Sequence, residues 1–304
     1  MKKNNKKIIV ILGPTSSGKS DIAIRLAKKF NGEIISADSR QVYRSLDIGT
    51  GKTTAKEQKG IKHYLIDVAS PRTNYNAAKF KKDADKIIED ILKREKMPII
   101  CGGTGFWIKS IIDNVQYPEV KPDWVLRDQL RNKSAEELFL MLKKLDKERA
   151  KNIDPKNKVR LIRAIEICKS LGKVPEVNRE SRIKNYEFLQ IGIRLPKENL
   201  YKNIEKRLRK RFDQGMIEEV RKLHFKDKLS WKKIEGFGLG YFWIPKYLKG
   251  EIKSEEELFE KIFQAEKDYA KRQMTWFKKD ARIVWLDNDK IIAKSTSSFL
   301  KNKR

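Results

Sequence analysis

One segment, Gly13–Ser20, limits the possible folds more than any other feature of the chain. It reads Gly-Pro-Thr-Ser-Ser-Gly-Lys-Ser and fits the pattern G-x-x-x-x-G-K-[ST] in full. It follows the apolar, β-branched run Ile8–Leu12 and precedes apolar residues at helical spacing that end at Asn31-Gly32. The sequence therefore predicts a phosphate-binding loop between a buried strand and a helix.

The chemistry of such a loop follows from its backbone. Its glycines allow several N–H groups to point into one concavity, and the next helix adds its positive N-terminal end. Lys19 supplies a cation for phosphate oxygens, and Ser20 supplies a hydroxyl for Mg²⁺. We therefore expect a ligand that carries a diphosphate or triphosphate group, as in ATP-binding proteins. The residues predicted to bind it are Gly13, Pro14, Thr15, Ser16, Ser17, Gly18, Lys19 and Ser20.

Strands and helices then alternate along the first 120 residues. Short apolar runs predict strands at Glu33–Ala37, His63–Val68 and Pro98–Cys101, and an amphipathic pattern between 80 and 92 predicts a helix. Gly102–Gly105 opens a further helix, Phe106–Ile112. This alternation indicates an α/β fold with a parallel sheet.

The pattern changes after about residue 120, where only helical periodicity is seen until about residue 185. A strand, Phe188–Leu195, a long basic helix from about 198 to 225, a helix Glu255–Lys278 and a last strand Ile283–Leu286 follow, and the final residues look like a frayed tail. We predict a P-loop NTPase-like core (1–120 and 186–304) with C-terminal helices, interrupted by a helical insertion domain (121–185).

The charge balance suggests the kind of partner. Seventy Lys and Arg against 41 Asp and Glu give a net charge of +29, which favours a polyanion such as RNA, although a Lys-rich proteome would give the same excess. With only two cysteines and two histidines, the sequence argues against a disulfide framework and against a structural zinc site. No apolar stretch reaches membrane-spanning length, and we expect a soluble, cytoplasmic protein.

Two polar residues follow predicted strands at the edge where ligands of such sheets gather. Asp38 follows the second strand and is a candidate for orienting a nucleophile, or else an Asx-turn residue. Thr104 follows the fourth strand and offers a hydroxyl to a ligand, or else caps the next helix. A GTPase would need Asn-Lys-x-Asp, which is absent, whereas a small-molecule kinase stays open.

Several ordered blocks resemble the tRNA dimethylallyltransferases, also called tRNA isopentenyltransferases or the IPP transferase family. Besides the phosphate loop, the similar blocks are Asp38–Tyr43, Leu46–Thr50, His63–Val68, Gly102–Gly105, Asp154-Pro155 with Arg160, Arg163, Ala164 and Glu166, Gly215–Val220, and Arg272–Phe277. The resemblance covers most of the chain and is far more specific than a phosphate loop alone.

The resemblance implies transfer of a dimethylallyl group from dimethylallyl diphosphate to N6 of the adenine 3′ of the tRNA anticodon, with Mg²⁺ and release of diphosphate. It assigns proton removal to Asp38, a hydrogen bond to Thr104 and a further active-site role to Arg127. It also implies a channel between core and insertion, into which the base is flipped. The implied tRNA-binding residues are Asp38, Ser39, Arg40, Gln41, Val159, Arg160, Leu161, Ile162, Arg163, Arg272 and Gln273. We expect a monomer that binds tRNA and no membrane.

Some features leave alternatives open. The basic run Lys206–Arg211 is either an RNA contact or a solvated helix face, and the Arg272–Phe277 block is either an RNA contact or an internal anchor. Phe242-Trp243 follow Gly240-Tyr241 where the family usually has a basic and an acidic residue, so the resemblance does not extend to the RNA contacts of that segment. The competing functions are an isopentenyltransferase of free adenine nucleotide, a small-molecule kinase and a non-catalytic RNA-binding protein.

Overall fold

The computed structural model describes residues 6–175 and 186–301. The chain divides into two compact units. The core unit comprises Met1–Asn114 and Ile183–Arg304, and the insertion unit comprises Val115–Arg182. No helix in the described ranges is both long and apolar enough to cross a bilayer.

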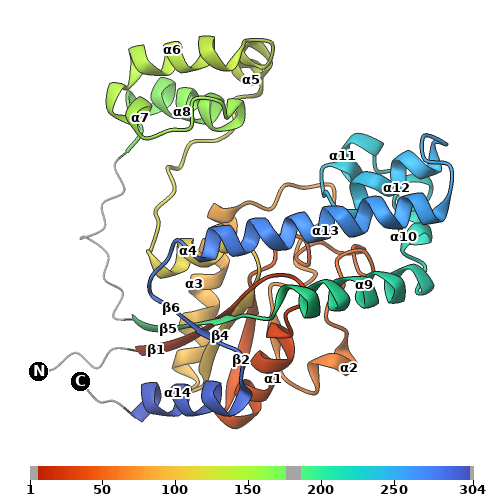
Figure 1. Cartoon of the computed structure of the whole chain (residues 1–304). Coiled ribbons are helices and arrows are strands. Elements are labelled where there is room, and N and C mark those ends of the chain that lie inside the picture. The colour runs from red at the N-terminus through yellow and green to blue at the C-terminus, as the bar shows by residue number, and fades with distance from the viewer. Residues whose placement is uncertain (1–5, 176–185, 302–304) are drawn as a thin grey trace, which may run out of the picture. The chain divides into compact units, whose positions relative to one another are not determined.

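The core unit is built on a six-stranded sheet in the order β3-β2-β4-β1-β5-β6 (Figure 1). Every neighbouring pair is parallel, which confirms the predicted α/β fold. Cys101 of β4 pairs with Ile11 of β1 on one side and Ser36 of β2 on the other, so these strands end at one edge. The strands are β1 Lys6–Leu12, β2 Gly32–Ser36, β3 His63–Tyr64, β4 Met97–Gly102, β5 Tyr186–Ile193 and β6 Ile283–Leu286.

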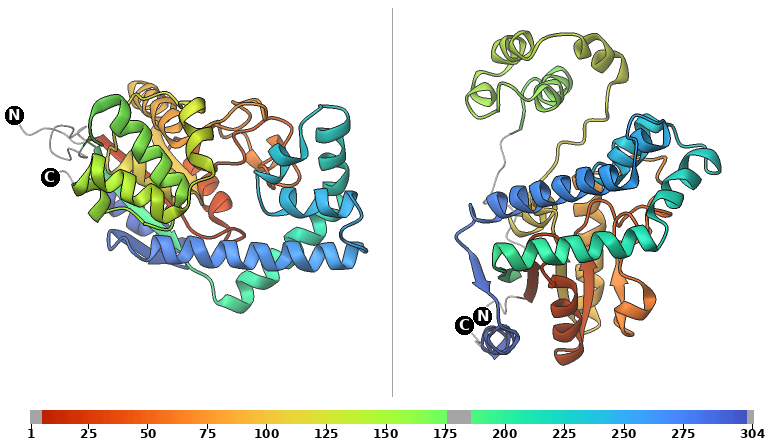
Figure 2. Two further views of the ribbon diagram at one scale, coloured as in Figure 1. Left: turned by 90° about the horizontal axis from the view of Figure 1, so that it is seen from above. Right: turned by 45° about the vertical axis from the view of Figure 1, so that its right-hand side comes forward.

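Ten helices of the core unit lie in the described part of the chain. α1 packs its apolar face on the sheet, in a core cluster that also holds Ile292 of α14. α9 and α13 run side by side (Figure 1 and Figure 2), and the buried pair Arg211–Glu266 joins them. The helices are α1 Lys19–Lys29, α2 Ala55–Gln58, α3 Ala77–Lys93, α4 Gly105–Ile112, α9 Lys197–Asp213, α10 Met216–Phe225, α11 Trp231–Glu235, α12 Gly240–Leu248, α13 Glu255–Phe277 and α14 Asp289–Lys301.

The insertion unit contains only helices in its described residues, namely α5 Trp124–Arg131, α6 Ala135–Leu145, α7 Lys147–Lys151 and α8 Lys158–Leu171. Ser134 starts α6 with a capping box, because its hydroxyl accepts from the Glu137 N–H while the Glu137 carboxylate accepts from the Ser134 N–H. Leucines of α5, α6 and α8 form a separate apolar core. Residues 176–185 of the predicted insertion lie outside the described residues.

Three sequence predictions need correction. The strand predicted at His63–Val68 stops at Tyr64, because Leu65 and Asp67 adopt positive φ angles of 61° and 57°. The helix predicted from 198 to 225 is two helices, because Gly215 has a φ of 88° and caps α10. The predicted tail forms α14, in which Ile292 and Thr296 are buried.

Candidate active site

The phosphate loop joins β1 to α1 and has the conformation that its glycines allow. Gly13 and Gly18 have φ angles of 153° and 83°, and a Cβ at Gly13 would lie 3.0 Å from the Ile193 carbonyl oxygen. The Ser16 and Ser17 hydroxyls are buried, and neither has a hydrogen-bond partner among the described residues. Because unsatisfied buried hydroxyls are costly, this loop is suited to a ligand rich in oxygen atoms.

Lys19 lies at the start of α1 with its amine turned into a cavity of about 360 Å³. Its Nζ donates to the Pro14 carbonyl oxygen at 3.1 Å. Burial lowers the pKa of Lys19, and the positive charge of Arg207 acts in the same direction. A bound anion would stabilise the charged form of the Lys19 amine and oppose both effects, so the electrostatics of the site favour a phosphorylated ligand.

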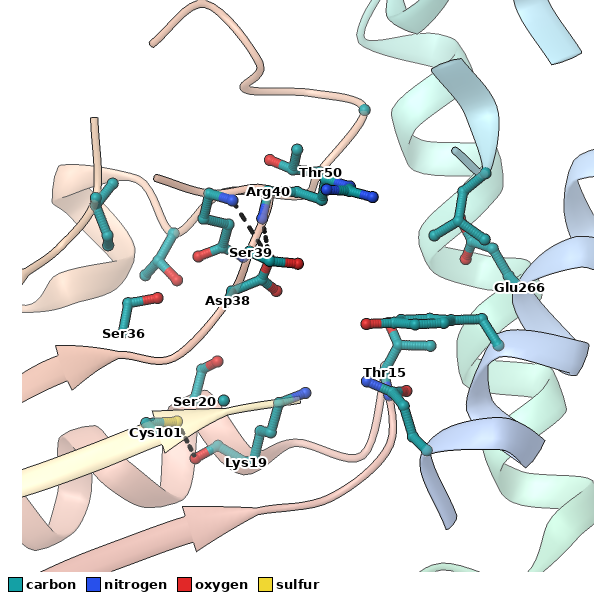
Figure 3. A pocket seen from close by; sticks show the side chains of 18 of the residues that line it. Thr15, Lys19, Ser20, Ser36, Asp38, Ser39, Arg40, Thr50, Cys101 and Glu266 are labelled. Carbon is teal, nitrogen blue, oxygen red and sulfur yellow. Dashed lines mark hydrogen bonds between the residues drawn. The ribbon is translucent and has the colours of Figure 1, made fainter. Parts of the chain in front are cut away.

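Asp38 follows β2 and faces the same cavity. Figure 3 shows the Asp38 and Lys19 side chains turned toward one open space from opposite sides. One carboxylate oxygen of Asp38 accepts from the backbone N–H groups of Arg40 (2.8 Å) and Gln41 (3.3 Å). The Asx-turn alternative is therefore present, but it uses only one oxygen and holds the carboxylate at the cavity wall.

Thr104 links the second glycine-rich turn to the Asp38 segment. Its hydroxyl accepts from the Ser39 N–H at 3.0 Å and does not cap α4. Its own N–H donates to the Ala37 carbonyl oxygen at 3.2 Å. A Cβ at Gly102 would lie 2.2 Å from that oxygen, so only glycine permits this approach of the two strand ends. Thr104 therefore fixes the backbone beside Asp38.

The late block Arg272–Phe277 divides between two roles. The buried Gln273 amide accepts from the Thr15 N–H at 2.8 Å and donates to the Gly103 carbonyl oxygen at 2.9 Å. Gln273 is thus an internal anchor between the phosphate loop and the Gly103 turn, and it also lines the cavity, so its contact with tRNA stays a prediction. Arg272 is exposed and lines the cavity, so it is free to face a ligand.

Ser39, Arg40 and Gln41 line the cavity next to Asp38. The Arg40 Nε donates to the Phe237 carbonyl oxygen, and the Gln41 amide donates to the Gly51 carbonyl oxygen at 3.4 Å. Both side chains therefore also tie this segment to neighbouring loops.

The basic run on α9 contributes two arginines to the site that the sequence did not predict there. Its exposed members are Lys206, Arg209 and Lys210, but Arg207 and Arg211 turn inward and line the cavity. Arg207 donates to the Thr15 hydroxyl at 3.3 Å and to the Gly51 carbonyl oxygen at 2.7 Å, which are both neutral groups. Burial and the charge of Arg211 lower the pKa of Arg207. The sequence signal was available, because Arg207 and Arg211 are one helical turn apart beside the buried Leu208.

Tyr269 of α13 is a second side chain that the sequence did not single out. It lines the cavity near Asp38 and Thr104. Burial and the negative charge of Asp38 raise its pKa to about 12, so the phenol keeps its proton at neutral pH. Arg272 lies over its ring, with the guanidinium carbon 5.9 Å from the ring centroid.

The remaining predicted residues lie in the insertion unit. Arg127 donates to both oxygens of the buried Glu166, at 2.7 and 2.8 Å, and Arg163 donates to the same carboxylate at 3.0 Å. Val159 and Arg160 are exposed and Ile162 is partly buried. Leu161 is fully buried in the apolar core of the unit, next to the exposed Arg160 on α8, and its contact with tRNA stays a prediction.

Fold and site together define the chain as a P-loop α/β protein with a helical insertion. The model of the IPP transferase family matches residues 41–280, and the chain belongs to this family. It is 41% identical to the tRNA dimethylallyltransferase of Acetivibrio thermocellus, over 97% of this chain and 95% of that protein. The tRNA dimethylallyltransferase of Staphylococcus epidermidis is 40% identical, over 93% and 87%.

Two solved structures of transferases from this family are also similar to the chain. The tRNA Δ(2)-isopentenylpyrophosphate transferase of Staphylococcus epidermidis is similar with a TM-score of 0.71 and 37% identity, over 98% of this chain and all of that one. A eukaryotic dimethylallyltransferase acting on tRNA gives a TM-score of 0.77 and 27% identity, over 98% of this chain and 76% of that one.

Proposed function

We propose that this chain is a tRNA dimethylallyltransferase, a prenyltransferase that modifies an adenine of tRNA. The names of the full-length relatives support tRNA prenylation over the free-nucleotide, kinase and binding-protein alternatives. The observation that carries the proposal is the placement of Lys19 and Asp38 on opposite sides of one cavity. The donor is dimethylallyl diphosphate, and the acceptor is N6 of the adenine 3′ of the anticodon.

The cationic side of the cavity holds the leaving group. When the allylic C–O bond breaks, negative charge builds on the diphosphate, and Lys19, Arg207 and the loop N–H groups stabilise it. The Ser16 and Ser17 hydroxyls lie in the same loop and can donate to phosphate oxygens. Apolar groups of the cavity, among them Ile34, Ile66 and Phe237, suit the dimethylallyl chain.

The acidic side of the cavity serves the acceptor. The lone pair of an adenine amine is delocalised into the ring, so the amine is a poor nucleophile. Asp38 accepts a hydrogen bond from it and takes the proton that is lost when the new C–N bond forms. Thr104 holds the backbone at Ser39 and keeps this carboxylate in place. In this transfer one C–O bond breaks, one C–N bond forms, diphosphate leaves, and one proton passes from the amine to Asp38.

Mg²⁺ fits this site as a partner of the diphosphate. Among the described residues no group of three His, Cys, Asp or Glu side chains is placed to hold a metal ion. The Ser20 hydroxyl, which lines the cavity, would hold Mg²⁺ together with diphosphate oxygens and water, which is common for this ion. Bound there, Mg²⁺ supplies positive charge that neutralises the leaving group.

The insertion unit is the proposed binding surface for the tRNA backbone. Val159 and Arg160 are exposed at the first turn of α8, and Arg127 and Arg163 share the single carboxylate of Glu166. One carboxylate between two guanidinium groups leaves a net positive charge, which suits a phosphate. We further propose that the protein acts as a monomer in the cytoplasm.

Incubation with tRNA and dimethylallyl diphosphate, followed by nucleoside mass spectrometry, tests the function. We expect one prenylated adenosine per tRNA and release of diphosphate. Transfer of labelled γ-phosphate to a small molecule, with unmodified tRNA, would favour the kinase alternative.

A further inference from the structure

The turn Asp47–Gly51, between β2 and β3, forms part of the cavity wall through Gly49. The backbone N–H groups of Asp47, Ile48 and Gly49 all donate to the carboxylate of Glu219, at 2.7, 2.7 and 2.9 Å. Glu219 lies in the first turn of α10, about 170 residues away along the chain. A carboxylate that accepts three successive N–H groups fixes the conformation of that backbone.

Tyr241 of α12 completes this arrangement. Its hydroxyl donates to Glu219 at 2.7 Å, and its ring is buried against Gly49, where a Cβ would lie 2.6 Å from the phenol oxygen. Burial and the negative charge of Glu219 raise the pKa of Tyr241 well above its ordinary value, so the phenol remains a donor. None of these four donors to Glu219 is a charged side chain, and three of them are N–H groups of the turn. The carboxylate of Glu219 therefore acts mainly on the turn.

The carbonyl side of the same turn faces the two inward arginines. The Gly49 carbonyl oxygen accepts from Arg211 at 3.0 Å, and the Gly51 carbonyl oxygen accepts from Arg207 at 2.7 Å. A Cβ at Gly51 would lie 2.2 Å from the Arg207 Nη2, so turn and guanidinium are in close contact. Arg207 in turn reaches the phosphate loop at Thr15. The position of the turn therefore sets the position of the guanidinium.

We propose that Glu219 is a positioning residue for the diphosphate site. Glu219 holds the N–H side of the Asp47–Gly51 turn and thereby fixes the carbonyl oxygens that orient Arg207 against the phosphate loop. This inference rests on the proposed function, in which the anion beside Arg207 is the diphosphate of the donor. It also gives a role to Tyr241, which precedes the unusual Phe242-Trp243 pair.

The affinity for inorganic diphosphate, measured by calorimetry with Mg²⁺, tests the proposal directly. Glu219→Gln keeps the size of the side chain but turns one acceptor oxygen into a donor that faces N–H groups, and we expect roughly tenfold weaker binding. Tyr241→Phe removes only one hydrogen bond, and we expect roughly threefold weaker binding. Glu218→Gln is the matched control, because Glu218 is an exposed neighbour that pairs with Arg221 at 3.1 Å, and its affinity should equal that of wild type.

A double-mutant cycle separates positioning from a general effect on folding. If Glu219 acts through Arg207, Glu219→Gln should cause little further loss of diphosphate affinity once Arg207→Ala is present. The proposal would be overturned if the affinity losses of the two single variants multiply in full in the double variant. It would also be overturned if the Glu219→Gln protein binds diphosphate within twofold of wild type. If Glu219→Gln fails to fold by circular dichroism, the same cycle with Tyr241→Phe decides.

The two proposals can fail separately. Wild-type protein that binds diphosphate but never prenylates tRNA would contradict the proposed function. The diphosphate affinities of the variants relative to wild type would still test the positioning role of Glu219. Wild-type protein that binds no diphosphate would contradict both. In steady-state assays, we expect Glu219→Gln to raise the KM for dimethylallyl diphosphate about tenfold while the KM for tRNA stays unchanged.

Discussion

Strand β2 carries a carboxylate near each end, and the two have opposite surroundings. At the N-terminal end, Glu33 is buried and receives hydrogen bonds from Arg94 (2.8 and 2.7 Å), Lys96 (2.8 Å) and Tyr64 (2.7 Å). Beyond the C-terminal end, Asp38 uses one oxygen for backbone N–H groups and faces a cavity.

This difference separates a structural carboxylate from a functional one. Hydrogen bonds from Arg94 hold the pKa of Glu33 far below its usual range, so Glu33 stays ionised and takes up no proton at working pH. Asp38 stands across the cavity from Lys19, where an incoming ligand can meet its carboxylate. A buried carboxylate whose two oxygens are both held by protein donors stabilises the fold, whereas a carboxylate that faces a cavity can take part in a reaction.

The largest expected effect is that of Asp38→Asn on turnover. The amide cannot take a proton, so we expect the single-turnover rate to fall roughly a hundredfold or more while tRNA and donor still bind. Glu33→Gln is the matched control on the same strand and should leave the rate near that of wild type. A near-normal rate for Asp38→Asn would remove Asp38 from the mechanism and end the contrast between the two carboxylates.

The cationic side of the cavity should show a division of labour. Lys19→Ala should weaken diphosphate binding roughly tenfold or more, because it removes the positive charge that we propose binds the phosphate oxygens. Ser20→Ala should weaken the dependence on Mg²⁺, and tRNA affinity should change little in either variant. An equal loss of tRNA and donor affinity, measured by filter binding and calorimetry, would contradict this division.

Glu33→Gln should act on stability instead. Removing the charged acceptor of Arg94 and Lys96 should lower the free energy of unfolding by about 2 kcal/mol at pH 7, as measured by denaturant titration. Because the folded-state pKa of Glu33 is depressed, its stabilisation is complete above the unfolded pKa of about 4.3 and is lost as pH falls toward the folded value. The difference between variant and wild type should therefore shrink below about pH 4. A difference independent of pH would contradict the assigned role of the charge.

Much of the active site could be predicted because each of its parts is a short local motif that directly follows a strand. The phosphate loop, Asp38 and Thr104 follow strands whose carboxyl ends meet at one edge of the sheet. Other features depend on contacts between distant segments. Gln273 is an anchor because its amide forms hydrogen bonds with the backbone of both Thr15 and Gly103. Glu219 accepts hydrogen bonds from a turn some 170 residues away in sequence.

Local conformation limited the rest of the prediction. Leu65 and Asp67 adopt positive φ angles that the apolar pattern does not predict, so the third strand is shorter than its apolar run. α14 is polar along most of its length and buries few residues, so it resembles a tail in sequence. The run on α9 was ambiguous because charge alone does not tell an inward arginine from a solvated one.

Prenyl incorporation into two anticodon stem-loops distinguishes tRNA prenylation from the competing functions. One carries adenine 3′ of the anticodon and the other carries guanine there, with free AMP as a third acceptor. We predict incorporation into the adenine stem-loop only, because guanine has a carbonyl where adenine has the amine that attacks and gives its proton to Asp38. The guanine stem-loop should still bind, since backbone contacts do not depend on the base. Strong incorporation into AMP with none into the adenine stem-loop would contradict tRNA prenylation and favour the free-nucleotide alternative.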